Sequence, residues 1–110
     1  MLSFSHFGIC VSDLERSLRF YRDGVTLELL GFESPGHTGD GRRRPMNLLG
    51  LTHISLRVDD VEGVAATIED LGGAIVRGSR TTFGADGTRM DFLYCTDPDG
   101  VRIELMDLPG

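Results

Sequence analysis

The fold is decided by one stretch near the end of the chain, Thr96-Asp97-Pro98-Asp99-Gly100-Val101-Arg102-Ile103-Glu104-Leu105-Met106-Asp107-Leu108. Asp-Pro-Asp-Gly predicts a tight turn, because proline fixes φ at the second turn position and glycine accepts the geometry that closes the turn. The residues after the turn alternate with a period of two, so Val101, Ile103 and Leu105 share one face of a predicted strand. Glu104 projects from the opposite face, and for this carboxylate alone a solvent-exposed strand position is the simpler interpretation.

A second copy of this pattern lies in the first half of the chain. The stretch from Gly24 to Leu29 matches it and places Glu28 on Glu104, 76 positions later. The segments around His6 and His53 also match each other, with an offset of 47 positions. The chain is therefore interpreted as an internal duplication, in which each half opens with a histidine strand and closes with a glutamate strand.

The two offsets differ by 29 residues, so the first half is too short for a full copy. His53 and Glu104 are 51 positions apart, which is enough for a strand, a helix and three further strands. His6 and Glu28 are only 22 positions apart. Either the first half has lost two middle strands, or a segment is missing near Tyr21 to Val25. A loss would leave apolar strand edges in water, which favours the missing segment.

The composition is that of an ordinary globular domain. Of the 110 residues, 40% are hydrophobic and 25% are charged, which fits one domain with a modest core. The net charge of −6 argues against a nucleic-acid partner, because phosphate binding needs concentrated positive charge and only Arg42-Arg43-Arg44 offers any. We find no apolar run of bilayer length and no signal-peptide pattern, so we expect a cytoplasmic protein without a membrane partner. Cys10 and Cys95 are expected to be small buried side chains rather than a disulfide.

Hydrophobic periodicity predicts an α+β fold of two βαβββ modules, with the first module short of two strands. We expect a single domain over residues 1–110, with the first module and a linker at 1–50 and the second module at 51–110. The first helix is expected to start at the Ser-x-x-Glu capping box that begins at Ser12 and to pack Leu14, Leu18 and Tyr21 on the sheet.

The second half gives the complete set of elements. Asp59 and Asp60 are expected to cap a helix that ends at Gly72-Gly73. The apolar stripe of this helix consists of Val61, Ala65, Ile68 and Leu71. Besides the strand that contains Glu104, the strands predicted for the whole chain are 4–11, 25–32, 51–58, 74–83 and 89–95, with a loop at 84–87 between the last two.

Four side chains with metal-binding chemistry share the face of the predicted strands that points away from the helices: His6, Glu28, His53 and Glu104. A single histidine in a strand is usually a hydrogen-bonded structural residue. Here two of the three histidines of the chain occupy equivalent positions of a repeat, each with its own glutamate. Two imidazoles and two carboxylates suit a divalent ion such as Zn, Ni, Co, Mn or Fe.

The chain resembles the vicinal oxygen chelate superfamily, which includes glyoxalase I, methylmalonyl-CoA epimerase, fosfomycin-resistance proteins, bleomycin-binding proteins and extradiol dioxygenases. The resemblance covers nearly the whole chain. It rests on Ser5-His6-Phe7 with the following helix to Tyr21, on the stretch from Leu51 to Val61, and on the stretch from Asp97 to Leu105. It implies paired βαβββ modules that form a cup around a metal, with the four ligand positions carried over to His6, Glu28, His53 and Glu104. The short first module departs from this pattern.

The resemblance also implies the chemistry. A metal with open positions can chelate two adjacent substrate oxygens and stabilise an enolate or enediolate, while a carboxylate removes a proton α to a carbonyl. Similarity to glyoxalase I and the epimerase suggests Glu104 as this base, with Glu28 as its counterpart. An extradiol dioxygenase needs two histidines and only one carboxylate, so Glu28 favours a lyase or isomerase. A metal-free antibiotic-binding protein is the third alternative.

Nothing in the sequence identifies the substrate beyond a small molecule. Arg57 shares the His53 face of its predicted strand and can meet an anionic group, or it is an arginine exposed to solvent. Relatives often pair modules between subunits, and an incomplete sheet leaves strand edges that take partners. We therefore expect a homodimer, with the metal site either within one chain or shared between two.

Overall fold

The computed structural model describes residues 2, 6–21, 27–85 and 88–108. The chain forms two compact units, Met1–Asp40 and Gly41–Gly110, each of which is described by itself. The predicted linker between the modules, residues 33–49, is therefore divided, and its part from Gly41 onward belongs to the second unit. No helix of the described residues is long and apolar enough to cross a membrane.

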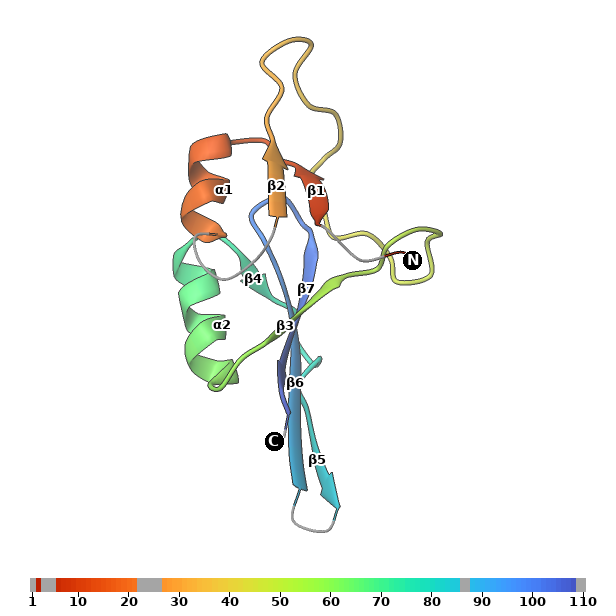
Figure 1. The fold of residues 1–110 in the computed structure, drawn as a ribbon, viewed down its shortest axis with the longest axis vertical. Coiled ribbons are helices and arrows are strands. Elements are labelled where there is room, and N and C mark those ends of the chain that lie inside the picture. Colours follow the sequence, from red (N-terminus) through yellow and green to blue (C-terminus); the bar gives the residue numbers. More distant parts are fainter. Residues whose placement is uncertain (1, 3–5, 22–26, 86–87, 109–110) are drawn as a thin grey trace. The chain divides into compact units, whose positions relative to one another are not determined.

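Unit 1 contains the strands β1 (Phe7–Cys10) and β2 (Leu27–Leu30) and the helix α1 (Leu14–Phe20) (Figure 1). The two strands are parallel. Exposed and half-buried residues alternate along both of them, which confirms the predicted period of two. The sequence leaves open whether two strands are lost or a segment is missing near Tyr21 to Val25. Residues 22–26, on which this question depends, lie outside the described residues.

Three details of unit 1 correct the predictions. The N-cap of α1 is Asp13 rather than Ser12, because the Asp13 carboxylate accepts a hydrogen bond from the Arg16 backbone N–H. Leu14 and Leu18 are 43% and 54% exposed instead of packed on the sheet, since the described part of unit 1 offers the helix only two short strands. Cys10 is exposed, because it lies on the same outward parity as His6; both cysteines are free, and Cys95 is fully buried as predicted.

Unit 2 contains the complete module. Its helix is α2 (Val61–Asp70), and its strands are β3 (Ile54–Arg57), β4 (Ala74–Ile75), β5 (Thr81–Ala85), β6 (Thr88–Thr96) and β7 (Arg102–Asp107). The sheet order is β3-β7-β6-β4, with β5 also paired to β6. The strands β3 and β7 are parallel, whereas β6 is antiparallel to its neighbours. Figure 1 shows α2 beside this sheet and the β5–β6 hairpin extending from it.

The core of unit 2 lies between α2 and one face of the sheet. Asp60 caps α2 as predicted, by accepting a hydrogen bond from the Gly63 N–H. The predicted helical stripe is buried at three positions, Val61, Ala65 and Ile68. From the sheet, the buried apolar residues are Leu93, Cys95, Ile103 and Leu105. This arrangement leaves the other parity of β6 and β7, including Glu104, on the face opposite the helix.

The predicted strand 74–83 is divided in two. The pairing partner of both pieces is β6, but three extra residues separate the registers of Ile75 with Cys95 and Thr81 with Phe92. Ser79 fills the gap, because its hydroxyl accepts a hydrogen bond from the Tyr94 N–H at 3.0 Å in place of a backbone carbonyl. Hydrophobic alternation in the sequence does not predict that a side-chain hydroxyl replaces a backbone carbonyl in the hydrogen bonding of β6.

The Asp-Pro-Asp-Gly turn forms as predicted. The Asp97 side chain accepts hydrogen bonds from the backbone N–H groups of Asp99 and Val101, at 2.9 and 2.8 Å. Gly100 has φ of +86°, a conformation that favours glycine. A Cβ atom there would overlap the carbonyl oxygen of Gly41, so the turn also fixes where the linker crosses it.

The architecture is α+β, with a βαβββ module in unit 2 and an incomplete copy of it in the described part of unit 1. In unit 2, β7 lies between β3 and β6. In unit 1, β2 corresponds to β7, and among the described residues it pairs with β1 alone. The first module is thus short of the two strands that the sequence offset indicated.

Candidate metal centre

His53 directly precedes β3, which begins at Ile54 and is shorter than the predicted strand 51–58, and Glu104 lies in the middle of β7. Ser55 is opposite Glu104 in the parallel register, and His53 precedes Ser55 by two residues, so both ligands lie on the face opposite α2. The His53 Nε2 atom is 3.5 Å from Glu104 Oε1. The two side chains are 25% and 16% exposed, which leaves them accessible to a small ligand but partly shielded from water.

Hydroxyl groups hold both members of this pair. The Thr52 Oγ1 atom is 2.8 Å from His53 Nδ1, which leaves Nε2 on the side of the glutamate. Ser55 donates a hydrogen bond of 2.8 Å from its hydroxyl to Glu104 Oε1. Arg102 in turn donates to the Thr52 carbonyl at 2.9 Å. Outer contacts of this kind orient metal ligands and select the ring nitrogen that faces the ion.

Tyr94 contacts both ligands from the neighbouring strand. It lies directly opposite Glu104 in the antiparallel register of β6 and β7. Its ring meets the His53 ring edge to face, with centroids 5.2 Å apart and an interplanar angle of 83°. Burial, the nearby negative charge of Glu104 and a hydrogen bond to Glu104 raise the pKa of the Tyr94 hydroxyl.

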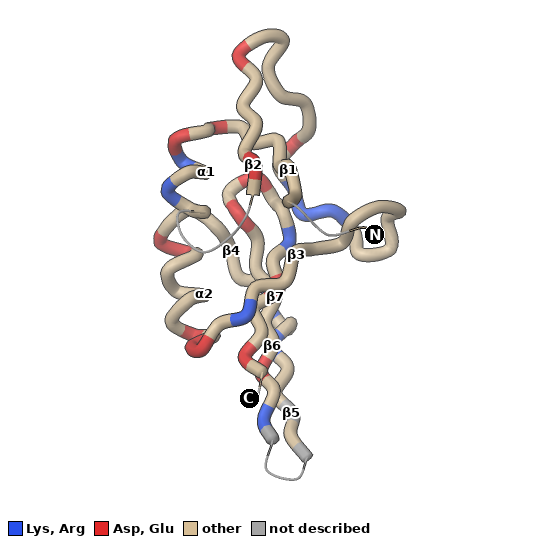
Figure 2. Tube along the Cα trace, viewed as in Figure 1, with Lys and Arg blue, Asp and Glu red and all other residues tan. Residues whose placement is uncertain are grey.

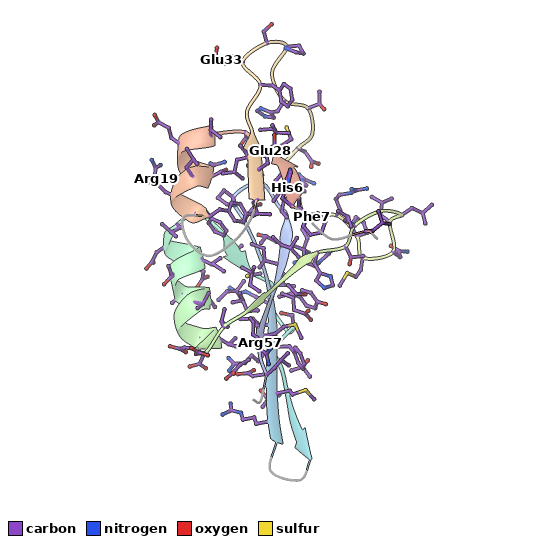
Figure 3. All side chains as sticks on the ribbon, in the orientation of Figure 1. His6, Phe7, Arg19, Glu28, Glu33 and Arg57 are labelled. Carbon is purple, nitrogen blue, oxygen red and sulfur yellow. The ribbon has the colours of Figure 1, made fainter. Side chains whose placement is uncertain are left out.

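The first-module pair repeats this register in unit 1. Gly8 is opposite Glu28, and His6 precedes Gly8 by two residues. The His6 Nε2 atom is 3.1 Å from Glu28 Oε2 (Figure 3). These side chains are 44% and 55% exposed, so this pair is more open to water than the second. The duplication found in the sequence is therefore also a duplication of strand register.

The geometry of each pair fits two ligands of one ion. Ligand atoms at roughly 2.1 Å from a metal lie about 3.0 Å apart in octahedral geometry and about 3.4 Å apart in tetrahedral geometry. The two measured separations, 3.1 and 3.5 Å, match this range. Within the described residues no group of three or more His, Cys, Asp or Glu side chains is placed to hold an ion. The structure forms the two pairs, each inside its own unit.

Arg57 lies at the end of β3, opposite Met106. Its side chain is exposed, and the alternation of the strand puts it on the face that carries Ser55 and His53. A guanidinium at this position suits an anionic group of a small molecule.

A second charged cluster lies on the helix side of the sheet. Arg80 binds Asp91 through two hydrogen bonds of 2.6 Å and also donates to Glu62 at 3.2 Å. The Arg80 and Thr82 hydrogen bonds lower the pKa of the buried Asp91 carboxyl. Figure 2 shows acidic residues at the N-terminal end of α2, close to this cluster. The Arg80–Asp91 bond ties β6 to the segment before β5 and is a structural feature.

Three residues around the second-module pair, Thr52, Ser55 and Tyr94, are not among the predicted site residues. Ser55 follows His53 by two residues, so strand alternation puts it on the His53 face and is a signal that could have identified it. The role of Tyr94 depends on β6 lying next to β7, and no periodicity in the sequence specifies that neighbour.

The comparisons with known proteins agree with this fold. A sequence model of the Glyoxalase/Bleomycin resistance protein/Dioxygenase superfamily matches residues 23–105, and the chain belongs to this superfamily. A probable lactoylglutathione lyase from Synechocystis sp. is 30% identical over 123 positions, which cover 92% of each chain. Because this alignment is longer than the 110 residues of the chain, the relative has residues without a counterpart here.

Solved structures share the architecture. A glyoxalase family protein from Bacillus cereus superposes with a TM-score of 0.78 at 17% identity, over 100% of this chain and 96% of its own. A glyoxalase/bleomycin resistance protein from Albidiferax ferrireducens gives 0.60 at 18% identity, over 94% and 98%. At these identities the likeness establishes the fold alone.

Proposed function

We propose that the protein is a divalent-metal-dependent lyase or isomerase of the glyoxalase type, which removes a proton α to a carbonyl of a small molecule. The observation that carries the proposal is the repeated pair: His6 with Glu28 and His53 with Glu104, at the same strand register in both units. One histidine beside a glutamate is common in proteins, but the same pair at equivalent positions of two modules supports a common function as metal ligands.

In this proposal His6, Glu28, His53 and Glu104 together hold one ion. Each Nε2 atom already lies beside a carboxylate oxygen at a separation that two ligands of one ion adopt. When bound, a divalent cation supplies Lewis-acid stabilisation of the negative charge that develops on the substrate oxygen. The identity of the ion is open among Zn, Ni, Co, Mn and Fe.

Glu104 is the proposed base, with Glu28 as its counterpart. Glu104 is the less exposed of the two carboxylates, and the Ser55 hydroxyl fixes one of its oxygens. A positioned carboxylate contributes roughly 10² to 10⁴-fold to a proton transfer. The more exposed Glu28 is the ligand that is better placed to exchange with water or substrate.

Arg57 is the proposed contact for an anionic group of the substrate. It extends from the strand that begins next to His53 and is exposed on the same face. A relative that carries the name of a lactoylglutathione lyase supports a lyase over the alternatives of an extradiol dioxygenase and a metal-free binding protein. The two carboxylates support the same choice, because the dioxygenase site uses one.

The proposed assembly is a cytoplasmic homodimer. Among the described residues β2 lacks the antiparallel neighbour that β6 provides for β7, and open strand edges take partners. The two ligand pairs then meet either within one chain or across the dimer.

One experiment separates the three candidate activities. The purified protein is reconstituted with each metal in turn and incubated with hemithioacetals of 2-oxoaldehydes, with acyl-CoA epimers and with catechols. Metal-dependent conversion of a hemithioacetal or an acyl-CoA epimer is the expected result. Ring cleavage of a catechol, or metal-independent binding without turnover, would contradict the proposal.

A further inference from the structure

The strand β6 brings one side chain, Tyr94, against both ligands of the second module. Thr52, just before β3, contacts only His53 of these two ligands. Ser55, in β3, contacts only Glu104 of the two. The Tyr94 ring meets the His53 ring edge to face, and Tyr94 lies directly opposite Glu104 in the register of β6 and β7.

The backbone of Tyr94 is fixed on the side away from β7. Its N–H donates to the Ser79 hydroxyl at 3.0 Å, and its carbonyl accepts from the Val76 N–H at 2.9 Å and from the Ser79 hydroxyl at 3.3 Å. On the other side, β6 is paired with β7 at this position. The interruption between β4 and β5 therefore places Ser79 where it holds the residue that faces the ligands.

We propose that Tyr94 is a positioning residue of the candidate metal centre, with its hydroxyl holding the Glu104 carboxylate and its ring holding the plane of the His53 imidazole. This inference rests on the proposed metal-dependent function. A ligand pair held in this way already has one geometry before the ion binds, so less conformational entropy is lost on binding.

The two modules then differ in a predictable manner. Among the described residues of the first module, no strand pairs with β2 on the side where β6 pairs with β7, so none presents a counterpart of Tyr94 to Glu28. The residue equivalent to Ser55 in the first module is Gly8, which has no hydroxyl to offer. Each taken within its own unit, the second-module pair is accordingly assigned as the more ordered pair and the first-module pair as the more adaptable one.

The test uses cobalt(II), whose visible spectrum reports ligand geometry. Tyr94→Phe removes the hydroxyl and keeps the ring, and Tyr94→Leu removes both. The matched control is Tyr21→Phe, because Tyr21 is the other of the two tyrosines and ends α1 in unit 1. Loss of a positioning contact typically weakens metal binding by about 10 to 100-fold.

We expect Tyr94→Phe to bind cobalt about 10-fold more weakly than the wild type, with an altered visible spectrum and unchanged thermal unfolding of the metal-free protein. Tyr94→Leu is expected to bind more weakly still, and Tyr21→Phe to match the wild type. Wild-type affinity and spectrum in Tyr94→Phe would overturn the role of Tyr94 while leaving the proposed function intact. A wild type that binds no cobalt would overturn the metal-dependent function and this role with it.

A second measurement avoids any loss of folding in the Tyr94 variants. The chain contains no tryptophan and two tyrosines, so Tyr94 is the sole source of tyrosine emission in the Tyr21→Phe protein. Zinc drawn to Glu104 weakens the hydrogen bond that this carboxylate accepts from Tyr94, and the emission is expected to rise with saturation at one ion. Emission that stays constant while zinc binds would contradict the contact.

Discussion

His53 Nε2 lies 3.5 Å from Glu104 Oε1, on parallel strands whose register places Ser55, two residues after the histidine, opposite the glutamate. The first unit repeats this relationship, since Gly8 follows His6 by two residues and lies opposite Glu28. The two modules therefore share the residue types and a similar Nε2-to-carboxylate distance, 3.1 Å in the first and 3.5 Å in the second.

Removing His53 is expected to abolish stoichiometric metal binding without unfolding the protein. Alanine at this half-buried position removes one ligand and leaves the buried core residues of β7 in place. His37→Ala is the matched control, because His37 is the third histidine and is exposed in the linker. Metal content after desalting and circular dichroism measure the two properties. Equal retention of metal in His53→Ala and His37→Ala would exclude His53 as a ligand.

Replacing Glu104 with glutamine is expected to lower turnover by about 10² to 10⁴-fold, because the oxygen ligand remains but the base is lost. Metal affinity should fall less than turnover. Glu28→Gln is the matched comparison and should reduce turnover less than Glu104→Gln. Rates at saturating substrate decide this, and a larger loss in Glu28→Gln would transfer the role of base to the first module.

Gly100→Ala is expected to destabilise the protein by about 2 to 4 kcal/mol, because a positive φ and a clash with backbone act together. The added Cβ would overlap the Gly41 carbonyl oxygen. Gly78→Ala is a close control, since Gly78 has φ of +76° with nothing within 4 Å of its added Cβ, and it should cost about 1 kcal/mol. Urea unfolding measures both, and equal losses would show that the contact with the linker contributes nothing.

Asp91 is expected to make stability depend on pH. Because Arg80 lowers its pKa in the folded state, the stabilisation is fully present above the ordinary carboxyl pKa. It is lost as the pH falls through the lowered value. Unfolding free energies should therefore decline in acid more steeply for the wild type than for Asp91→Asn, whereas Asp70→Asn, at an exposed position, should follow the wild type. Parallel curves for wild type and Asp91→Asn would remove this source of pH dependence.

The homodimer is tested by light scattering of the purified chain. The open edge of β2 in the described part of unit 1 predicts a mass of two chains. A monomer at micromolar concentration would defeat the assembly proposal and would require both ligand pairs of a site to come from one chain.

The sequence predicted much of the fold because alternation and turn chemistry are local. The Asp97 to Gly100 turn, the helical stripe of Val61, Ala65 and Ile68, and the outward parity of Glu104 all depend on residues close to one another in the chain. Superfamily membership followed from the same motifs.

The remaining features depend on residues far apart in the sequence. Ser79 interrupts a predicted strand because its hydroxyl pairs with Tyr94, fifteen positions away. Tyr94 reaches Glu104 only because β6 lies beside β7. Leu18 is exposed because the first module offers its helix two strands, which a helical pattern taken alone does not reveal.

The most direct test of the central proposal is the metal content of the wild-type protein. The chain is reconstituted separately with nickel, cobalt, zinc, manganese and iron, desalted, and measured by mass spectrometry of the metal against protein concentration. Four ligands drawn from two equivalent pairs predict one ion per chain with at least one of these metals. Retention of none of the five would contradict the account.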